Sequence, residues 1–175
     1  MNILDKIIFD KRREVELKKS LIPVSQLEHA ALFDSRTISL SKILRSSQTG
    51  IIAEHKRRSP SKSEINYNFT VEEVVKGYES AGVCGISVLT DGKYFGGSLD
   101  DLLLARASVN VPLLRKEFIV DEYQILEAKA HGADLILLIA AVLTREEIKK
   151  LSEFAESLGL EVLLEVHNLE ELQKS

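Results

Sequence analysis

The sequence contains a short apolar run, Gly85–Ile86–Ser87–Val88–Leu89, with the length and composition of a buried β-strand. Similar runs occur on both sides of it, at Ile51–Ala53, Val111–Leu114, Leu135–Leu138 and Val162–Leu164. From Ile51 through Ile86, Leu113 and Leu135 to Val162, the steps between runs are 35, 27, 22 and 27 residues. This spacing predicts alternating strands and helices, and therefore a parallel sheet with right-handed crossovers.

The segments between the runs carry signals for the start of a helix. Residues with the spacing of helix caps are Thr70, Ser98 and Thr144 between the runs, and Asn168 after the last run. Two architectures fit this order of elements, an open doubly wound sheet and a TIM-type barrel. Because no G-x-G-x-x-G or Walker-type glycine loop follows a strand, the sequence does not favour nucleotide binding.

The first 49 residues contain no comparable strand-like run and are predicted to be helical. Ile3, Leu4, Ile7 and Ile8 repeat at helical spacing, and Pro23 marks a break. A second helical patch follows around Leu40. Residues 1–49 are therefore predicted to form a helical extension ahead of a strand-containing part over residues 50–175.

Composition limits the classes of partner. The chain has 175 residues, of which 45% are hydrophobic, and a formal net charge of −4, so nucleic acid is not an expected partner. The single cysteine, Cys84, excludes an internal disulfide and is predicted to be a buried core thiol. No apolar stretch approaches a membrane span, and the charged first 20 residues do not resemble a secretory signal. We expect a cytoplasmic protein that does not contact a membrane.

Charged residues stand at the ends of three of the predicted strands. Because side chains alternate along a strand, they share a face with apolar residues: Glu54 and Lys56 with Ile52, Lys116 with Leu114, and Glu165 with Leu163. If the apolar side chains fill a barrel, the charges meet at the rim where barrel active sites lie. Apolar surroundings lower the pKa of a lysine and raise that of a glutamate, so such a cluster suits general acid and base catalysis.

Two connecting segments are candidates for binding a small anion. Lys56–Lys62 combines cations with hydroxyl groups, which suits phosphate or carboxylate. Asp91–Gly97 is glycine-rich, and its Phe95 is suited to contact an aromatic ligand. Both segments also fit plain surface loops. The four histidines show no metal-ligand spacing, so no metal is predicted.

Four motifs in register closely resemble the indole-3-glycerol phosphate synthase family of tryptophan biosynthesis. They are Ile51–Ser61, Ser87–Ser98, Leu113–Ile119 and Leu163–His167. The segment Ile3–Val15 also resembles that family's helix ahead of the barrel. The resemblance covers essentially the whole chain. It implies an α/β fold of the (βα)8 TIM barrel family, here an incomplete barrel of about five βα units behind the helical extension.

The resemblance also implies a reaction and a substrate. The family is a carbon–carbon lyase, of the carboxy-lyase type, that acts without cofactor or metal on a small phosphorylated anion. It closes 1-(2-carboxyphenylamino)-1-deoxyribulose 5-phosphate to indole-3-glycerol phosphate, releasing carbon dioxide and water.

By motif position, the resemblance assigns roles to individual residues. Lys116 is the general acid that protonates the substrate carbonyl oxygen. Glu165 and Glu54 move protons during dehydration, and Glu54 also stabilises positive charge on the nitrogen. Lys56 holds a substrate anion and donates a proton to the leaving hydroxyl. The implied substrate contacts are Ser59, Lys93, Phe95 and Phe118, with Lys93 as a second candidate acid. The sequence leaves open how the acid and base steps divide among these residues.

The sequence departs from the family at two points. His55 stands where the family usually has an apolar residue, and its side chain is expected to face the helix layer. The family has eight strands and five are counted here, so the chain is interpreted as a truncated, N-terminal two-thirds of a barrel. The missing part normally carries an Asn after strand six, a Glu–Ser pair after strand seven and a Gly–Ser phosphate cradle after strand eight. We therefore expect the isolated chain to be weakly active or inactive.

Three alternatives remain at this stage. One is another phosphate-binding barrel enzyme such as phosphoribosylanthranilate isomerase, although a suitably placed Cys/Asp pair is lacking. The second is an inactive barrel fragment that forms an oligomer or binds a partner chain through its open barrel edges. The third is an open α/β binding module, which the order of the strands decides.

Overall fold

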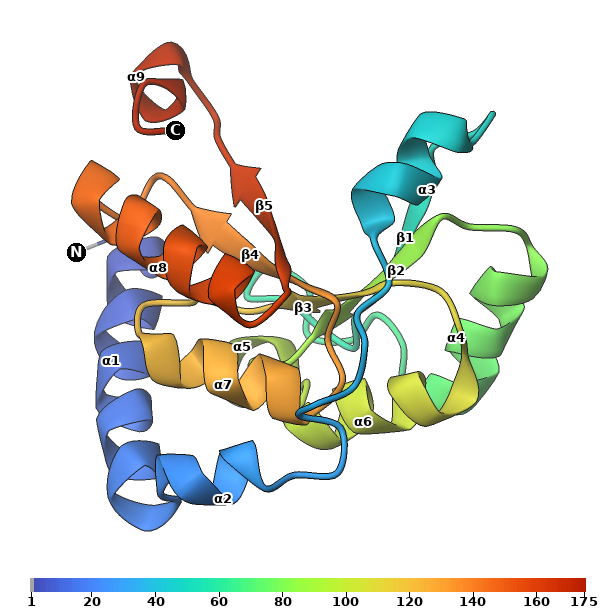
Figure 1. The fold of residues 1–175 in the computed structure, drawn as a ribbon, viewed down its shortest axis with the longest axis horizontal. Coiled ribbons are helices and arrows are strands. Elements are labelled where there is room, and N and C mark those ends of the chain that lie inside the picture. Colours follow the sequence, from blue (N-terminus) through green and yellow to red (C-terminus); the bar gives the residue numbers. More distant parts are fainter. Residues whose placement is uncertain (1) are drawn as a thin grey trace.

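The strands of the protein form one parallel sheet in the order β1-β2-β3-β4-β5, as a computed structural model describing residues 2–175 shows (Figure 1). Their bounds are β1 Ile52–His55, β2 Gly85–Leu89, β3 Leu113–Lys116, β4 Leu135–Ile139 and β5 Glu161–Glu165. Spatial order therefore equals chain order. A doubly wound sheet would instead reverse direction at a switch point, so the arrangement is that of a barrel wall. The predicted α/β fold with five parallel strands is confirmed.

The helices fall into three groups along the chain. The first three precede the sheet: α1 Ile3–Leu21, α2 Val24–Glu28 and α3 Leu40–Ser46. The crossovers contain α4 Val71–Ser80, the single turn α5 Gly92–Phe95, α6 Leu99–Ser108, α7 Glu122–Ala130 and α8 Arg145–Ser157. A last turn, α9 Leu169–Leu172, follows β5. In the part of the chain described, no helix has both the length and the apolar character needed to cross a bilayer.

The predicted helix caps are confirmed. The side chains of Thr70, Ser98, Thr144 and Asn168 each accept a hydrogen bond from the backbone N–H three residues further on. Such bonds satisfy donors that the first turn of a helix otherwise leaves free. These caps fix where four helices begin, and so how far each one reaches over the sheet.

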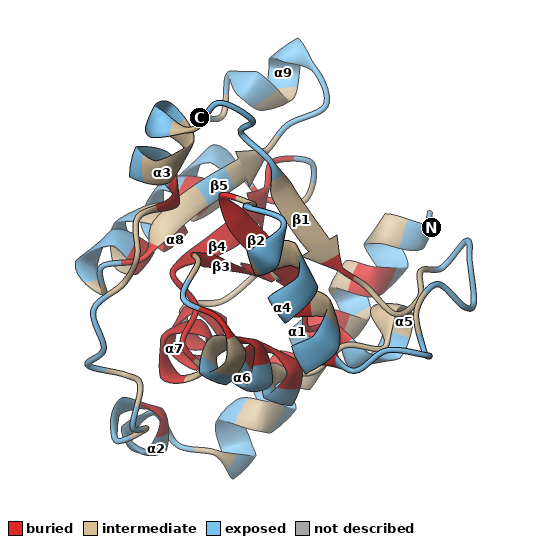
Figure 2. Ribbon diagram, turned by 90° about the vertical axis from the view of Figure 1, so that its right-hand side faces the viewer, coloured by how far each residue is buried: buried red, intermediate tan, exposed pale blue. Residues whose placement is uncertain are grey.

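The sheet separates two apolar layers. One layer packs the sheet against the outer helices and is centred on Ile86, Val88, Leu113, Ile136 and Leu138. On the other, inward face, Cys84, Leu114, Leu135, Leu137 and Ile139 pack beneath Leu40 of α3. Figure 2 shows the buried residues concentrated in β2, β3, β4 and α7, whereas β1 and β5 are of intermediate burial. The prediction that Cys84 is a buried thiol is confirmed.

The helical extension packs against the sheet-containing part through both apolar contacts and hydrogen bonds. α1 lies alongside α7, where Val15 packs with Tyr123 and Leu126 (Figure 1). Asp134, just before β4, accepts a hydrogen bond from Ile38 N at 2.7 Å. The helices predicted before Pro23 and around Leu40 are present, and the short helix α2 after Pro23 was not predicted. The division of the chain at residues 49 and 50 stays a prediction.

Two details of the sequence prediction are wrong in extent. Strand β3 begins at Leu113, not Val111, because Pro112 has no N–H to donate to the strand ladder. The segment Asp91–Gly97 is a helical turn, α5, rather than a plain loop, because the Asp91 side chain accepts from Tyr94 N and Phe95 N. The second difference matters for function, because this turn carries Phe95.

Candidate active site

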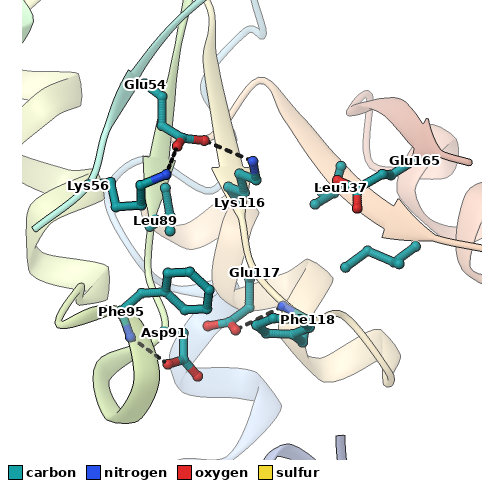
Figure 3. Close-up of a pocket in the computed structure, with 11 residues that line it drawn as sticks. Glu54, Lys56, Leu89, Asp91, Phe95, Lys116, Glu117, Phe118, Leu137 and Glu165 are labelled. Carbon is teal, nitrogen blue, oxygen red and sulfur yellow. Dashed lines mark hydrogen bonds and ion pairs between the residues drawn. The ribbon is translucent and has the colours of Figure 1, made fainter. Parts of the chain in front are cut away.

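A pocket opens at the carboxyl ends of the strands. The pocket is lined from the sheet by Glu54, Leu89, Lys116, Leu137, Ile139 and Glu165, and from the segments that follow β1, β2 and β3 by Lys56, Asp91, Phe95, Glu117 and Phe118 (Figure 3). The alternation along each strand sends the strand side chains of this set to the inward face, next to the apolar layer that includes Leu40 of α3. Polar groups over an apolar floor are typical of a site for a small molecule.

Glu54 lies between two lysines. Its Oε2 accepts from Lys116 Nζ at 2.8 Å, and its Oε1 accepts from Lys56 Nζ at 2.7 Å. Burial alone would raise the pKa of Glu54, but these two ammonium groups outweigh it and hold that pKa below its ordinary value. Glu54 is therefore an ionised carboxylate near neutral pH, able to stabilise positive charge.

Glu165 approaches the same pocket from β5, across from Lys116 and Glu54 (Figure 3). One of its carboxylate oxygens lies 3.4 Å from Nε2 of His167, which is largely exposed. Glu54 and Glu165 thus face the pocket from opposite edges of the sheet, in different surroundings. That difference suits two separate proton-transfer roles.

The rings of Phe95 and Phe118 form an aromatic wall. Their centroids are 5.9 Å apart and their planes are tilted by 38°. Both rings line the pocket, one from α5 and the other from the residues after β3. A flat aromatic ligand can contact such a pair at one end of the pocket while its anionic groups reach the lysines.

Six of the eight predicted site residues line this pocket, and two do not. Ser59 and Lys93 line a separate open hollow together with Arg58 and Tyr94. Lys93 there forms an ion pair with Asp10 of α1 at 2.7 Å. In this conformation neither Ser59 nor Lys93 reaches the group around Glu54.

One feature near the pocket is not apparent from the sequence. Lys11 of α1 is 2% exposed, and its Nζ lies 2.9 Å from Asp91 Oδ2 and 3.1 Å from Glu117 Oε1. A lysine in a helix is normally read as solvated, and here it is not. The available signal is its position, four residues from each of the buried Ile7 and Val15, on the apolar stripe of α1.

His55 is buried on the face of β1 opposite to Glu54. Both of its ring nitrogens lack a hydrogen-bond partner among the described residues. Burial lowers the pKa of His55, nearby Arg57 lowers it further, and Asp101 opposes them. No group of three His, Cys, Asp or Glu side chains within residues 2–175 is arranged to hold a metal ion.

The fold and the pocket define a class: an α/β chain of the barrel type with a charged, aromatic-walled pocket at the carboxyl ends of its strands. The family model described as indole-3-glycerol phosphate synthase matches residues 4–175. The chain belongs to that family.

Curated relatives agree with this assignment. A protein of Bacteroides thetaiotaomicron named indole-3-glycerol phosphate synthase is 51% identical over 98% of this chain. Proteins of the same name from Mycobacteroides abscessus and Bacillus mycoides are 42% and 46% identical over 99% and 98% of it. This chain spans 66%, 64% and 64% of the lengths of these three relatives. Among solved structures, methylornithine synthase matches 87% of this chain and 54% of its own, at a TM-score of 0.47 and 16% identity.

Proposed function

We propose that this chain supplies the first five strands of an indole-3-glycerol phosphate synthase active site, within tryptophan biosynthesis in the cytoplasm. The proposed substrate is 1-(2-carboxyphenylamino)-1-deoxyribulose 5-phosphate. In the reaction a ring carbon bonds to the substrate carbonyl carbon, the carboxylate leaves as carbon dioxide and the resulting hydroxyl leaves as water. This makes the protein a carboxy-lyase. The observation that carries the proposal is the Lys56–Glu54–Lys116 ion-pair chain facing the Phe95–Phe118 wall in one pocket.

The geometry supports a role for each group. Lys116 projects from the end of β3 and is the donor that protonates the carbonyl oxygen as the new bond forms. Glu54, ionised between the two lysines, stabilises positive charge on the substrate nitrogen. Lys56 attracts a substrate anion and protonates the leaving hydroxyl, and Glu165 accepts or donates a proton during dehydration. Cations and the aromatic wall together suit a substrate that is both anionic and aryl.

Ser59 and Lys93 belong to the proposal as substrate contacts, although the structure places them outside the pocket. Both lie in segments that follow strands, next to the exposed hollow that they share with Arg58. Lys93 would have to leave Asp10 to reach a substrate. We therefore rank Lys93 behind Lys116 as the acid.

The activity of the isolated 175-residue chain is proposed to be weak or absent. The family resemblance assigns further substrate contacts to residues after strands six, seven and eight, beyond the five strands described here. The full site is tested by joining residues 1–175 to the last third of the Bacteroides thetaiotaomicron relative, which is 51% identical over the shared region. Formation of indole-3-glycerol phosphate and release of carbon dioxide would both be measured.

We expect the joined protein to turn over the substrate and its Lys116→Ala variant to lose about a thousandfold in kcat. Lys149→Ala is the matched control, since Lys149 is 75% exposed and pairs with Glu153 on the surface of α8. A folded joined protein without turnover, or one whose Lys116→Ala variant keeps its rate, refutes the proposal. If the isolated 175-residue chain has the same kcat as the joined protein, the proposed impairment is refuted.

A second candidate function rests on the open edges of the sheet. Leu163, on the inward face of β5, is 39% exposed, and Ile51 at the other edge is 52% exposed. Such apolar exposure favours association with another chain or a second copy. Native mass measurement of the purified chain tests this, and a strictly monomeric, unaccompanied species rules it out.

A further inference from the structure

Lys11 is a buried ammonium between two buried carboxylates at the margin of the pocket. It lies on α1, and the carboxylates belong to Asp91, just after β2, and Glu117, just after β3. Asp91 and Glu117 are each 2% exposed and each also line the pocket. Glu14, one turn along α1, accepts from Lys11 at 2.9 Å and is the more exposed partner.

Each of the two carboxylates also holds the backbone of one pocket phenylalanine. Asp91 Oδ1 accepts from Phe95 N at 3.2 Å and from Tyr94 N at 2.6 Å, which caps the turn α5. Glu117 Oε1 accepts from Phe118 N at 2.9 Å, and the same oxygen lies 3.1 Å from Lys11 Nζ. Figure 3 shows the bond from Phe95 N to Asp91 and the bond from Phe118 N to Glu117 as dashed lines, with both carboxylates near the two rings.

We propose that Lys11 is a positioning residue, which fixes the Phe95–Phe118 wall by bridging the two carboxylates that anchor those phenylalanines. The inference rests on the proposed function for its consequence, namely that the wall receives the aryl part of the substrate. The bridge itself is a property of the fold.

The charge balance of the cluster supports this role. Two carboxylates this deeply buried repel each other and lose their hydration, and a cation placed between them offsets both costs. Burial by itself would lower the pKa of Lys11, but Glu117 and Asp91 outweigh it and raise that pKa above its ordinary value. Thr90 and Arg115 also approach the other oxygen of Glu117, at 3.0 and 3.7 Å. Lys11 is thus the ammonium common to both anchors.

The test uses Lys11→Met, which keeps a long unbranched side chain and removes its charge. Lys18→Met is the matched control, because Lys18 is also on α1 and pairs with buried Glu127 without touching either anchor. The readouts on the 175-residue chain are hydrogen exchange of the Phe95 and Phe118 amides and ring-to-ring contacts by NMR. We expect Lys11→Met to speed both exchanges and lose the ring contacts, while Lys18→Met keeps them even where it lowers stability.

Two further variants keep the proposal testable if Lys11→Met does not fold. Asp91→Asn should loosen the Phe95 amide alone, and Glu117→Gln the Phe118 amide alone, because each loses one arm of the bridge. Unchanged exchange and ring contacts in folded Lys11→Met overturn the proposal. So does equal loosening of both phenylalanines by each single-anchor variant.

A ligand-binding measurement separates this inference from the proposed function. The probes are anthranilate, which carries the aryl carboxylate of the proposed substrate, and inorganic phosphate, each titrated into the joined protein. In Lys11→Met the Kd for anthranilate should rise about tenfold while that for phosphate changes little. Loosened rings with unchanged anthranilate binding overturn the consequence for the substrate but leave the bridge intact. Unchanged amide exchange and ring contacts in Lys11→Met overturn the bridge, whatever the change in ligand affinity.

Discussion

Lys116 Nζ donates to Glu54 Oε2 at 2.8 Å and so joins β3 to β1, two strands that are separated by β2 in the sheet. The pair spans 62 positions in the chain. Lys56 occupies the other oxygen of the same carboxylate. Glu54 is therefore the centre of the site's charge arrangement, and its ionisation is the most direct test of that arrangement.

The titration of Glu54 should depend on Lys116. In the wild-type chain its pKa lies below the ordinary 4.5, because hydrogen bonds from Lys116 and Lys56 outweigh burial. Lys116→Met removes the first of these bonds and leaves the burial, so the pKa of Glu54 should rise. Carbon NMR of carboxyl-labelled glutamate measures the midpoint in both proteins.

The sign of the linked stability follows from the lowered pKa. Ionised Glu54 contributes its full stabilisation above pH 4.5, and this is lost as pH falls through its lowered pKa. In Lys116→Met the higher pKa of Glu54 lies closer to that of the unfolded chain, so less stability should be lost as pH falls. Lys149→Met serves as the control, and an equal midpoint for Glu54 in wild type and Lys116→Met would show that the pair is not formed in solution.

His55→Leu should stabilise the protein by about 1 kcal/mol, since two buried, unpartnered ring nitrogens are replaced by an apolar side chain of similar size. The pKa of His55 is lowered, first by burial and then by Arg57, from its ordinary 6.5. As pH falls, His55 of the unfolded chain takes up a proton before His55 of the folded chain. The stability of the folded protein is therefore unaffected by His55 above pH 6.5 and decreases as pH drops toward the lowered pKa. Urea unfolding above and below pH 6.5 should show this fall reduced in His55→Leu. Identical pH dependence in both proteins would contradict the prediction.

Most of the site was predictable because strand alternation is a local rule. The two-residue period carries Glu54, Lys116 and Glu165 to the same face as Ile52, Leu114 and Leu163, whichever partners they meet. In the structure these charges line one pocket over an apolar floor. The expectation that His55 faces the helix layer agrees with its burial opposite Glu54.

The rest depended on contacts that no local pattern encodes. Lys11 follows helical spacing, but only the arrival of Asp91 and Glu117 from two other segments makes its burial tolerable. Lys93 sits in the predicted motif, yet it pairs with Asp10 of α1, 83 positions away. Strands such as β1 also continue beyond the apolar runs of the sequence. Backbone pairing, for example of Glu54 with Ser87, continues where the side chains become charged.

Asp134→Ala should cost about 3 kcal/mol of unfolding free energy, because one buried donor and two partly buried donors lose their acceptor together. The carboxylate of Asp134, 3% exposed, accepts from Ile38 N at 2.7 Å, Leu113 N at 2.8 Å and Arg106 Nη1 at 2.9 Å. Urea denaturation measures the change, and exposed Asp34→Ala is the control, expected to stay within about 0.5 kcal/mol. A loss as small as that of the control would mean that Ile38 is not held to the sheet in this way.

Gly97→Ala should disturb the turn that presents Phe95 to the aromatic wall, and Gly77→Ala should not. A Cβ at Gly97 would lie 2.0 Å from the carbonyl oxygen of Leu89, a backbone atom at the end of β2. The chain after α5 must then shift, at a cost of about 3 kcal/mol. Gly77 lies inside α4 with no heavy atom within 4 Å of its added Cβ, so alanine there should gain about 0.5–1 kcal/mol of stability.

The two glycine variants therefore change stability in opposite directions for stated reasons. Urea unfolding gives the sign of each change, and NMR contacts between the Phe95 and Phe118 rings report the wall. Gly97→Ala should weaken those ring contacts, since Gly97 N also donates to Asp91 O at 2.8 Å and closes the turn that presents Phe95. Alanine tolerated at residue 97 with intact ring contacts would mean that the segment after β2 does not approach Leu89 so closely, and that the aromatic wall is placed by other means.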